Sequence, residues 1–372
     1  MSSAPGAEQS DPPDPQLADR LSRRALELVD TPSVSRSEAA IADYVERAID
    51  GQRLRLSFAG DDCRFFATER RAGLPLVVLA GHLDTVPPQG NIPGRMDTGE
   101  IHGLGASDMK SGVAVMVELA RWLERDAPVT SVDTGFLFFS REELTVEESP
   151  IPALLAAEPL LRAADLVVIM EPTANAVQLG CLGNLNADAY FAGESSHSAR
   201  PWLGVNAIHN ALLGLQDIAL REPSEILVDG LPFVEVVNVT GIEGGIARNV
   251  IPDEAVCHIN FRYAPGRSRS EAEEELRALV PKGEVRIVGN APPARVALDN
   301  PLVAKLQGVS GAEFEPKQAW TNVAEFSAAG IDAVNFGPGD PELAHRADER
   351  VAIRSLVESY LMLQRWLTGT AG

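Results

Sequence analysis

A histidine and an aspartate two residues apart, His82 and Asp84, follow the apolar run PLVVLAG at positions 75–81. The run is typical of a buried β-strand, and residues two apart on an extended segment project to the same side. One ring nitrogen of His82 could then bind a metal ion while the Asp84 carboxylate holds the other. A polar strand end in a turn is the alternative interpretation.

Four carboxylates occupy comparable positions. Asp108 lies in the glycine-containing loop GLGASDMKSG, where it could also serve as an ordinary helix cap. Glu142 and Glu143 follow the apolar run FLFFS, and adjacent like charges are costly unless a cation compensates them or water solvates the loop. Glu171 follows the apolar run VVIM. Because α/β sheets place ligand sites at the carboxyl ends of their strands, these side chains are expected at one edge.

The remaining candidate, His345, lies in PELAHRADE near the end of the chain. A single loop histidine is usually just solvated, but the combined set provides two imidazoles and three carboxylates, which suits a pair of divalent ions. Two Zn²⁺, three carboxylates with one bridging, and a bridging hydroxide would form a neutral cluster. Glu142 is then left without an ion and is free to accept a proton from the activated water.

The elements around these residues alternate between helix and strand. Apolar periodicity predicts helices over 17–30, 37–50, 111–125 and 151–163, and strands over 53–58, 63–69, 74–81, 134–140 and 165–170. This alternation predicts an α/β fold with a mixed, mostly parallel sheet and flanking helices.

A smaller α+β unit interrupts this pattern. It has strand-like segments at 233–242 and 254–263 and helical segments at 205–220 and 269–280, after which α/β texture returns with a strand at 332–337 and a helix at 351–367. We therefore expect a disordered tail at 1–16, a catalytic domain formed by 17–175 and 291–372, and an inserted lid or dimerisation domain at 176–290.

Composition excludes several classes of protein. The formal charge of −21, from 53 acidic and 32 basic side chains, argues against nucleic acid as a partner. No apolar run is long enough to span a membrane, and the first residues lack the features of an export signal. Three widely spaced cysteines form no CxxC pair, which fits a reducing cytoplasm.

The ordered motifs GHLDTVP, GASDMKSG, the Glu142-Glu143 pair, MEP, HSARPWLGVNAIH, NVIPDEAVCHINFRY and AHRADE resemble the co-catalytic zinc amidohydrolases and exopeptidases. This family includes succinyl-diaminopimelate desuccinylases, acetylornithine deacetylases, aminoacylases and glutamate carboxypeptidases. The similarity covers nearly all of the chain after the tail.

The resemblance implies a role for each matching residue. His82 and Glu171 would bind one ion, Glu143 and His345 the other, and Asp108 both. Asp84 would support His82, and Glu142 would be the general base. His197, in HSARP, would polarise the scissile carbonyl, commonly across a dimer interface, and a histidine can donate to an oxyanion. A surface histidine is the alternative.

Within the family, AWTNVAEF and VNFGPGDPELAH look most like actinobacterial-type succinyl-diaminopimelate desuccinylases. Asn249, Arg262 and Thr321 occupy positions that resemble the family's substrate contacts, and the guanidinium of Arg262 suits a carboxylate. Asn322 stands where the family usually has aspartate.

The resemblance thus implies metal-dependent hydrolysis of a small anionic N-acyl amino acid, most similar to N-succinyl-LL-2,6-diaminopimelate, in lysine and diaminopimelate biosynthesis. N-acetylornithine, another N-acyl amino acid or a peptide C-terminus would suit the same metal ligands. A non-catalytic binding or dimerisation relative is the alternative from another class, although all five ligands and Glu142 are present. Two Zn²⁺ are expected, with Co²⁺ or Mn²⁺ as alternatives, and a homodimer through residues 176–290.

Overall fold

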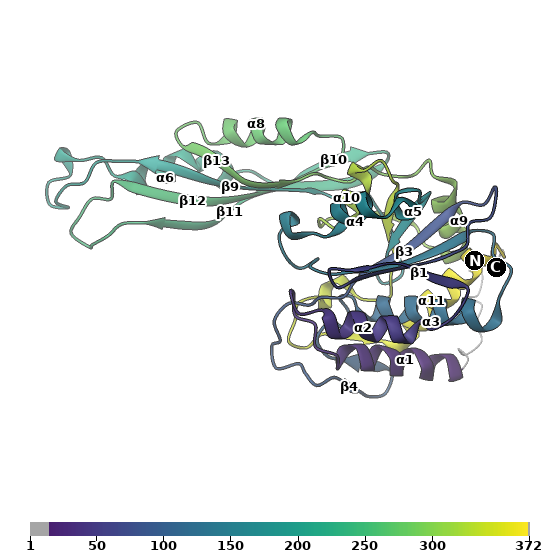
Figure 1. The fold of residues 1–372 in the computed structure, drawn as a ribbon. Helices are drawn as coiled ribbons and strands as arrows, with labels where there is room; N and C mark the ends of the chain where they lie inside the picture. The colour runs from purple at the N-terminus through teal and green to yellow at the C-terminus, as the bar shows by residue number, and fades with distance from the viewer. Residues whose placement is uncertain (1–14, 371–372) are drawn as a thin grey trace, which may run out of the picture.

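The computed structural model describes residues 15–370, so the tail expected at 1–16 lies almost entirely outside the described residues. The expected α/β fold is confirmed: an eight-stranded mixed sheet forms the centre of the larger domain (Figure 1). Its strands, in spatial order, are β1 (Leu54–Gly60), β2 (Cys63–Thr68), β6 (Asp133–Phe139), β3 (Leu76–His82), β7 (Leu166–Ile169), β15 (Ala333–Asn335), β8 (Val177–Leu179) and β14 (Phe314–Pro316).

The central strands β6, β3, β7 and β15 run parallel. All residues of β3, β6 and β7 are buried, which explains their continuous apolar sequences. Because these strands are parallel, the residues that follow them emerge at one edge of the sheet. This arrangement delivers His82, Glu142 and Glu171 to neighbouring positions.

Helices cover both faces of this sheet. One face packs against α1 (Pro15–Val29), α2 (Ala39–Ala48), α3 (Lys110–Asp126), α9 (Pro301–Ser310) and α11 (Ile353–Thr368). The other packs against α4 (Ile151–Ala157), α5 (Pro159–Arg162) and α10 (Val323–Ala328). The single helix expected over 151–163 is divided before Pro159, which has no N–H to continue the helical hydrogen bonds.

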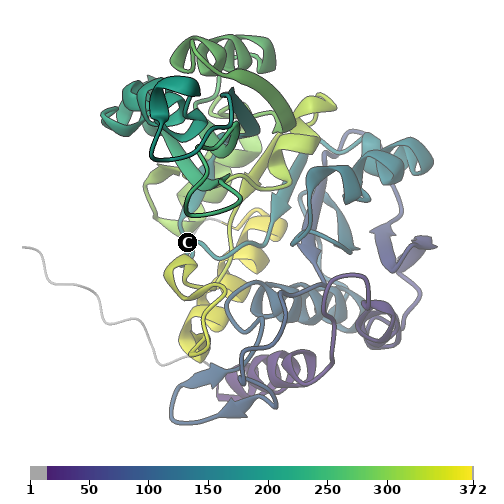
Figure 2. The ribbon, with the colours of Figure 1, turned by 90° about the vertical axis from the view of Figure 1, so that its left-hand side faces the viewer.

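The smaller domain is a five-stranded antiparallel sheet that extends away from the larger one (Figure 1). Its order is β10 (Ser224–Val228), β11 (Leu231–Gly244), β12 (Glu254–Tyr263), β9 (Gly183–Ala192) and β13 (Glu284–Ala291). The helices α6 (Ala207–Gly214), α7 (Gln216–Ala219) and α8 (Arg269–Leu279) belong to it. Figure 2 views this domain from its outer end, with the larger domain behind. We refer to it as the lid.

The sequence places the start of the lid at 176, whereas β8 lies in the eight-stranded sheet and the lid sheet begins at Gly183. A separate three-stranded sheet of β4 (Arg95–Met96), β5 (Glu100–His102) and β16 (Arg350–Ala352) lies near α1. Three short 3₁₀ helices complete the elements, at Val146–Glu148, Pro201–Leu203 and Pro341–Leu343. Among residues 15–370, no helix combines the length and apolar character needed to cross a membrane.

Candidate metal centre

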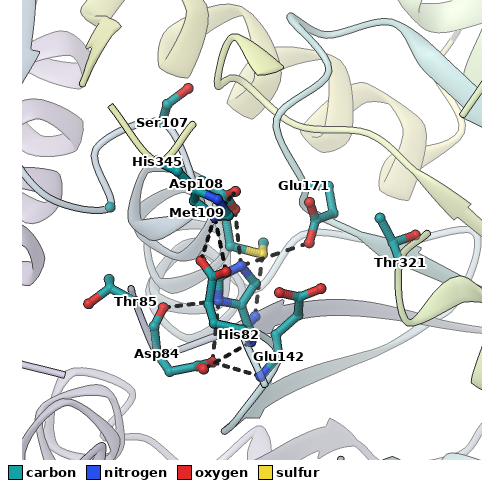
Figure 3. Close-up of polar contacts among 12 residues, drawn as sticks. His82, Asp84, Thr85, Ser107, Asp108, Met109, Glu142, Glu171, Thr321 and His345 are labelled. Atoms are coloured by element: carbon teal, nitrogen blue, oxygen red, sulfur yellow. Dashed lines mark hydrogen bonds and ion pairs between the residues drawn. The ribbon is translucent and has the colours of Figure 1, made fainter. Parts of the chain in front are cut away.

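His82 is fully buried at the end of β3, and Asp84 fixes its ring from below (Figure 3). The ring Nδ1 lies 3.1 Å from the backbone oxygen of Asp84 and 3.5 Å from its Oδ1. The other nitrogen, Nε2, faces Asp108. This is the arrangement in which a histidine presents one defined nitrogen to a metal ion.

The Asp84 carboxylate also positions the segment that carries Glu142 and Glu143. It accepts the backbone N–H of Glu142 at 2.9 Å, that of Glu143 at 3.1 Å and the hydroxyl of Ser35 at 2.8 Å. Burial alone would raise the pKa of Asp84, but His82 and these donors stabilise the ionised carboxylate and leave its pKa below the usual value. Asp84 therefore connects two of the strand ends that build the site.

The first ligand group is buried. The Nε2 atom of His82 lies 3.1 Å from Oδ1 of Asp108 and 3.8 Å from Oε1 of Glu171. Burial, together with the nearby charges of Asp108 and Glu143, raises the pKa of Glu171 to about 7, although Lys317 and His82 oppose this. Its Oε1 is buried without a hydrogen-bond partner among the described residues. Because buried polar atoms normally have a partner, this carboxylate oxygen is suited to bind a cation.

The second ligand group is more open. The Nε2 atom of His345 lies 3.0 Å from the Glu143 carboxylate and 3.6 Å from Oδ2 of Asp108. The His345 side chain is 51% exposed, and its backbone has a positive φ of 59°. The hydrogen bond to Glu143 is the main cause that raises the pKa of His345 to about 9.

Asp108 belongs to both groups. The ligand atoms of His82, Asp108 and Glu171 lie within 4.8 Å of one another, as do those of Asp108, Glu143 and His345. Two nitrogen and three carboxylate ligands, with one carboxylate shared, suit a pair of divalent ions such as Zn²⁺. The donor set and the unpartnered oxygen of Glu171 therefore fit two ions. His82, Glu171 and Asp108 would hold one of them, and Asp108, Glu143 and His345 would hold the other.

Glu142 lies beside this cluster. Its pKa is raised well above the usual value by loss of water contact and by the charges of Glu171, Glu143 and Asp108, with His82 acting in the opposite direction. Its carboxylate also lies close to His82 and Glu143. Within residues 15–370 it accepts no hydrogen bond, whereas its backbone N–H is bound to Asp84. The side chain is thus available to exchange a proton with a group over the cluster.

Glu349, which the sequence did not single out, holds the loop that carries Asp108. Its buried carboxylate accepts three backbone N–H groups, from Gly105, Ser107 and Asp108, each at 2.9 Å. Burial raises its pKa to about 6, with those three donors acting to lower it. Glu349 lies four residues after His345, so it joins the two loops. Glu349 is the last residue of the AHRADE motif, but nothing in that motif indicates the contact that it makes with the Asp108 loop.

Glycine allows the same two loops to approach each other. A Cβ added at Gly339 would lie 2.2 Å from the backbone oxygen of Ser107, and the Ser107 hydroxyl donates to the Asp340 backbone oxygen at 2.7 Å. A side chain at position 339 would therefore separate the loops.

The expected substrate residues fall into two places. Arg262 and Thr321 lie where the lid joins the larger domain: Arg262 pairs in the sheet with Asn184, and the Thr321 hydroxyl donates to Asn335 Oδ1 at 3.1 Å. Figure 3 shows Thr321 on the Glu171 side of the cluster.

His197 and Asn249 lie at the outer end of the lid, where the Ser198 N–H donates to the Asn249 oxygen at 2.9 Å and the Nδ1 atom of His197 accepts the N–H of Ala199 at 3.1 Å. The ten residues of β9, at about 3.3 Å each, put this end about 30 Å from the start of the lid. Within one chain the structure does not bring His197 or Asn249 to the metal ligands.

A cleft of about 610 Å³ lies between the Glu143 segment and the lid. Its lining includes the side chains of Arg36, Glu143, Asn184, Asn186, Asn290 and Trp320. Asn260 donates to Asn184 Oδ1 at 2.8 Å and to Asn186 Oδ1 at 2.7 Å, and it accepts from Arg262 Nε at 3.0 Å. The lid thus presents the amides of Asn184, Asn186 and Asn290 to this cleft, and Arg262 is connected to them through Asn260.

Asn322, the departure from the family pattern, has a local structural explanation. Its amide donates to the buried Glu325 carboxylate at 2.6 Å, and the Ser149 hydroxyl donates to the same oxygen at 2.8 Å. An aspartate at 322 would place two carboxylates together. The asparagine is therefore matched to Glu325 within α10.

Apart from the groups at the cluster itself, Asp97, Glu100 and His102 also have ligand atoms within 4.8 Å of one another. This group lies on the small sheet, and two of its members already contact a cation: Arg95 approaches His102 Nδ1 at 3.1 Å and Asp97 Oδ2 at 2.8 Å. We interpret this group as structural.

The comparisons with known proteins agree with this geometry. Residues 78–369 match the model for "Peptidase family M20/M25/M40". The chain is 37% identical over 344 residues to the Mycobacterium tuberculosis protein DapE, which is named as a succinyl-diaminopimelate desuccinylase, covering 92% of this chain and 96% of that one. It is 35% identical over 348 residues to the succinyl-diaminopimelate desuccinylase of Corynebacterium glutamicum, covering 92% and 94%.

Solved structures share the fold. The aminopeptidase PepT of Bacillus cereus superposes with a TM-score of 0.78 at 18% identity, covering 94% of this chain and 98% of that one. The Bacillus subtilis YXEP protein, described as a dinuclear metal-binding peptidase, gives a TM-score of 0.70 at 15% identity, covering 94% and 97%. At these identities the likeness concerns the fold alone.

Proposed function

The chain belongs to peptidase family M20/M25/M40, and from that membership we propose that it is a metal-dependent amide hydrolase that converts N-succinyl-LL-2,6-diaminopimelate to succinate and LL-2,6-diaminopimelate. Its identity of 35–37% to two proteins named as succinyl-diaminopimelate desuccinylases, over 92% of the chain, supports this substrate. The observation that carries the chemistry is Asp108, which two candidate ligand groups share. Glu142 belongs to neither of these two groups, although its carboxylate lies within 4.8 Å of the ligand atoms of His82 and Glu143.

The residues at the centre would hold two divalent ions, which we propose to be Zn²⁺, with Co²⁺ or Mn²⁺ as alternatives. When bound, such ions polarise a carbonyl group and acidify water. The description of the YXEP protein as a dinuclear metal-binding peptidase supports the number.

The chain's own residues then handle the proton. Glu142 accepts a proton from the water that attacks the amide carbon, a role that suits a carboxylate that lies beside the cluster and accepts no hydrogen bond within residues 15–370. Glu142 then returns the proton to the leaving amine, so that it is ionised again at the end of the cycle. Asp84 keeps the Glu142 and Glu143 backbone in place through both transfers.

A second copy of the chain would supply His197 as a hydrogen-bond donor to the developing oxyanion. We propose a homodimer formed through the lid, because His197 and Asn249 cannot reach the metal ligands of their own chain. The same domain carries exposed apolar side chains: Trp202 is 74% exposed, Leu212 63% and Leu213 60%. A surface of this kind is suited to a partner.

Several observations fit the substrate and its compartment. A substrate with several carboxylates needs cationic and amide donors, which Arg262 and the asparagines of the cleft provide. We also propose a cytoplasmic location, which the three buried, unpaired cysteines support.

The test is succinate release from N-succinyl-LL-2,6-diaminopimelate by metal-free protein, with and without about two equivalents of Zn²⁺, alongside N-acetylornithine. We expect Zn²⁺-dependent turnover of the succinyl substrate alone. Turnover of N-acetylornithine instead would retain the chemistry and reject the substrate. Failure of both substrates would reject the proposed function.

A further inference from the structure

Lys317 is a buried cation at the junction of the two domains. It follows β14, and its backbone N–H donates to the Leu179 oxygen at the end of β8 at 3.4 Å. The next residue fastens this loop to the lid: Gln318 donates to the Pro232 oxygen at 2.9 Å and accepts the N–H of Val234 at 3.1 Å. The backbone at Lys317 is therefore held in place, and only 7% of the residue is exposed.

The Lys317 ammonium has no ion pair within 4.0 Å and no side-chain hydrogen bond among the described residues. Its charge does act on the metal ligands, since it lowers the pKa of Asp108 and opposes the rise at Glu171. It also acts on the thiol of Cys181, as does the guanidinium of Arg262. Cys181 lies beside the cluster, since its thiol is 3.9 Å from the backbone oxygen of Thr321, which Figure 3 shows on the Glu171 side. The charges of Lys317 and Arg262 therefore both act on this side of the site.

Several other buried charges in this chain have direct polar partners, among them the Lys110 ammonium, which donates to the Thr31 oxygen at 2.9 Å. Asp133, with a fully buried side chain, contacts Arg70 at 2.9 Å and Arg71 at 2.7 Å. Buried Glu118 contacts Arg24 at 3.1 Å. If Lys317 served only to neutralise a ligand, a contact of this kind would be expected. Burying a cation without such a contact costs free energy unless another group provides a contact.

A carboxylate of the substrate would provide this contact to the Lys317 ammonium. We propose that Lys317 binds a substrate carboxylate beside the metal centre and, with Arg262, selects substrates that carry one. This inference rests on the proposed function, because it requires an anionic N-acyl substrate. The substrate carries three carboxylates, and the one next to the scissile amide is common to all N-acyl amino acids, so it cannot select among them. The proposal therefore concerns the other two, on the succinyl group and at the distal end of the diaminopimelate moiety, which present the same chemistry to the ammonium.

The test compares K317M with K305M. Lys305 is an exposed residue of α9, so its replacement removes the same charge far from any proposed role. Removing a charge-assisted hydrogen bond typically costs about ten- to hundredfold in binding. We expect K317M to raise KM for N-succinyl-LL-2,6-diaminopimelate by about that factor with unchanged zinc content, and K305M to leave KM unchanged.

Two truncated substrates identify the carboxylate. N-acetyl-LL-2,6-diaminopimelate lacks the acyl carboxylate, and Nα-succinyl-L-lysine lacks the distal one. With one of these substrates K317M is expected to show no increase in KM. The carboxylate that this substrate lacks is then the one that Lys317 binds. A penalty of equal size on all three substrates, or none on any, would overturn the proposal.

Zinc loss in K317M would also overturn it, because it would assign Lys317 to the ligands themselves. If K317M does not fold, K317R replaces it. In that variant we compare kcat/KM for N-succinyl-LL-2,6-diaminopimelate with kcat/KM for the truncated substrate that the wild type cleaves less efficiently. We expect the ratio of the two values to fall, and an unchanged ratio contradicts the proposal. Should the wild-type protein cleave other N-acyl amino acids instead, the same variants are compared on pairs with and without an additional carboxylate.

Discussion

The two ligand groups that share Asp108 differ in how firmly the fold holds them. His82 and Glu171 follow central parallel strands, and their side chains are 0% and 7% exposed. Glu143 and His345 lie in loops, and His345 is 51% exposed with a left-handed backbone. The difference indicates that the sheet itself builds one ion site, whereas the other depends on contacts such as those of Glu349 and Asp84 that fasten loops to the sheet.

The largest effect is expected from removing the shared ligand. In D108A both groups lose a carboxylate, so we expect loss of both ions and a fall in turnover of about 10³ or more. Zinc content by atomic absorption and succinate release measure this. Retention of two tightly bound ions would mean that Asp108 does not bridge.

Separate histidine variants sharpen the contrast between the groups. Because His82 is buried, water cannot easily replace its nitrogen, whereas it can at exposed His345. We expect H82A to weaken the affinity of its ion at least about tenfold more than H345A weakens that of the other ion. Zinc titration of each metal-free variant measures this, and equal losses would contradict the distinction.

Glu349 should act mainly on the more open ligand group, which consists of Asp108, Glu143 and His345. In E349Q an amide –NH₂ faces backbone N–H groups, which removes at least one of the three hydrogen bonds to the Asp108 loop. Supporting contacts of this kind are worth about 10- to 100-fold in metal affinity. We expect a loss in that range for the weaker ion, with E313Q, at an exposed position, as the matched control. Wild-type metal affinity in E349Q would show that the Asp108 loop keeps its conformation without these hydrogen bonds.

A pH dependence gives the most gradual effect. The pKa of His345 is raised to about 9 by Glu143, so below that pH its proton must leave before an ion binds. The affinity of the group formed by Asp108, Glu143 and His345 for its ion should fall as pH drops from about 9 towards 6.5, by up to about tenfold per pH unit. The protonated ring also stabilises the metal-free fold below about 6.5, and this contribution disappears as pH rises through about 9. H345A should flatten the affinity profile, and an unchanged slope would contradict the assignment.

The sequence predicted the parts of this site that strands deliver. Continuous apolar runs before His82, Glu142 and Glu171 identify buried parallel strands, and the structure brings all three together. The similarity to the zinc amidohydrolase and exopeptidase family is likewise confirmed.

Contacts between distant segments could not be predicted in this way. Glu349 acts through backbone N–H groups more than 240 positions earlier, and Lys317 is defined by a loop that the lid fastens, so neither has a local pattern. The small sheet of β4, β5 and β16 was also missed, because strands of two or three residues have no usable periodicity. The pairing of Asn322 with Glu325 required the helix start to be known.

The most direct test of the central claim is to count zinc ions and measure turnover in E142A. If the five ligands hold both ions and Glu142 only moves the proton, the variant will bind two ions per chain as the wild type does. Its turnover of the succinyl substrate will fall by about 10² or more. Loss of an ion, or turnover near the wild-type value, would contradict this division of roles.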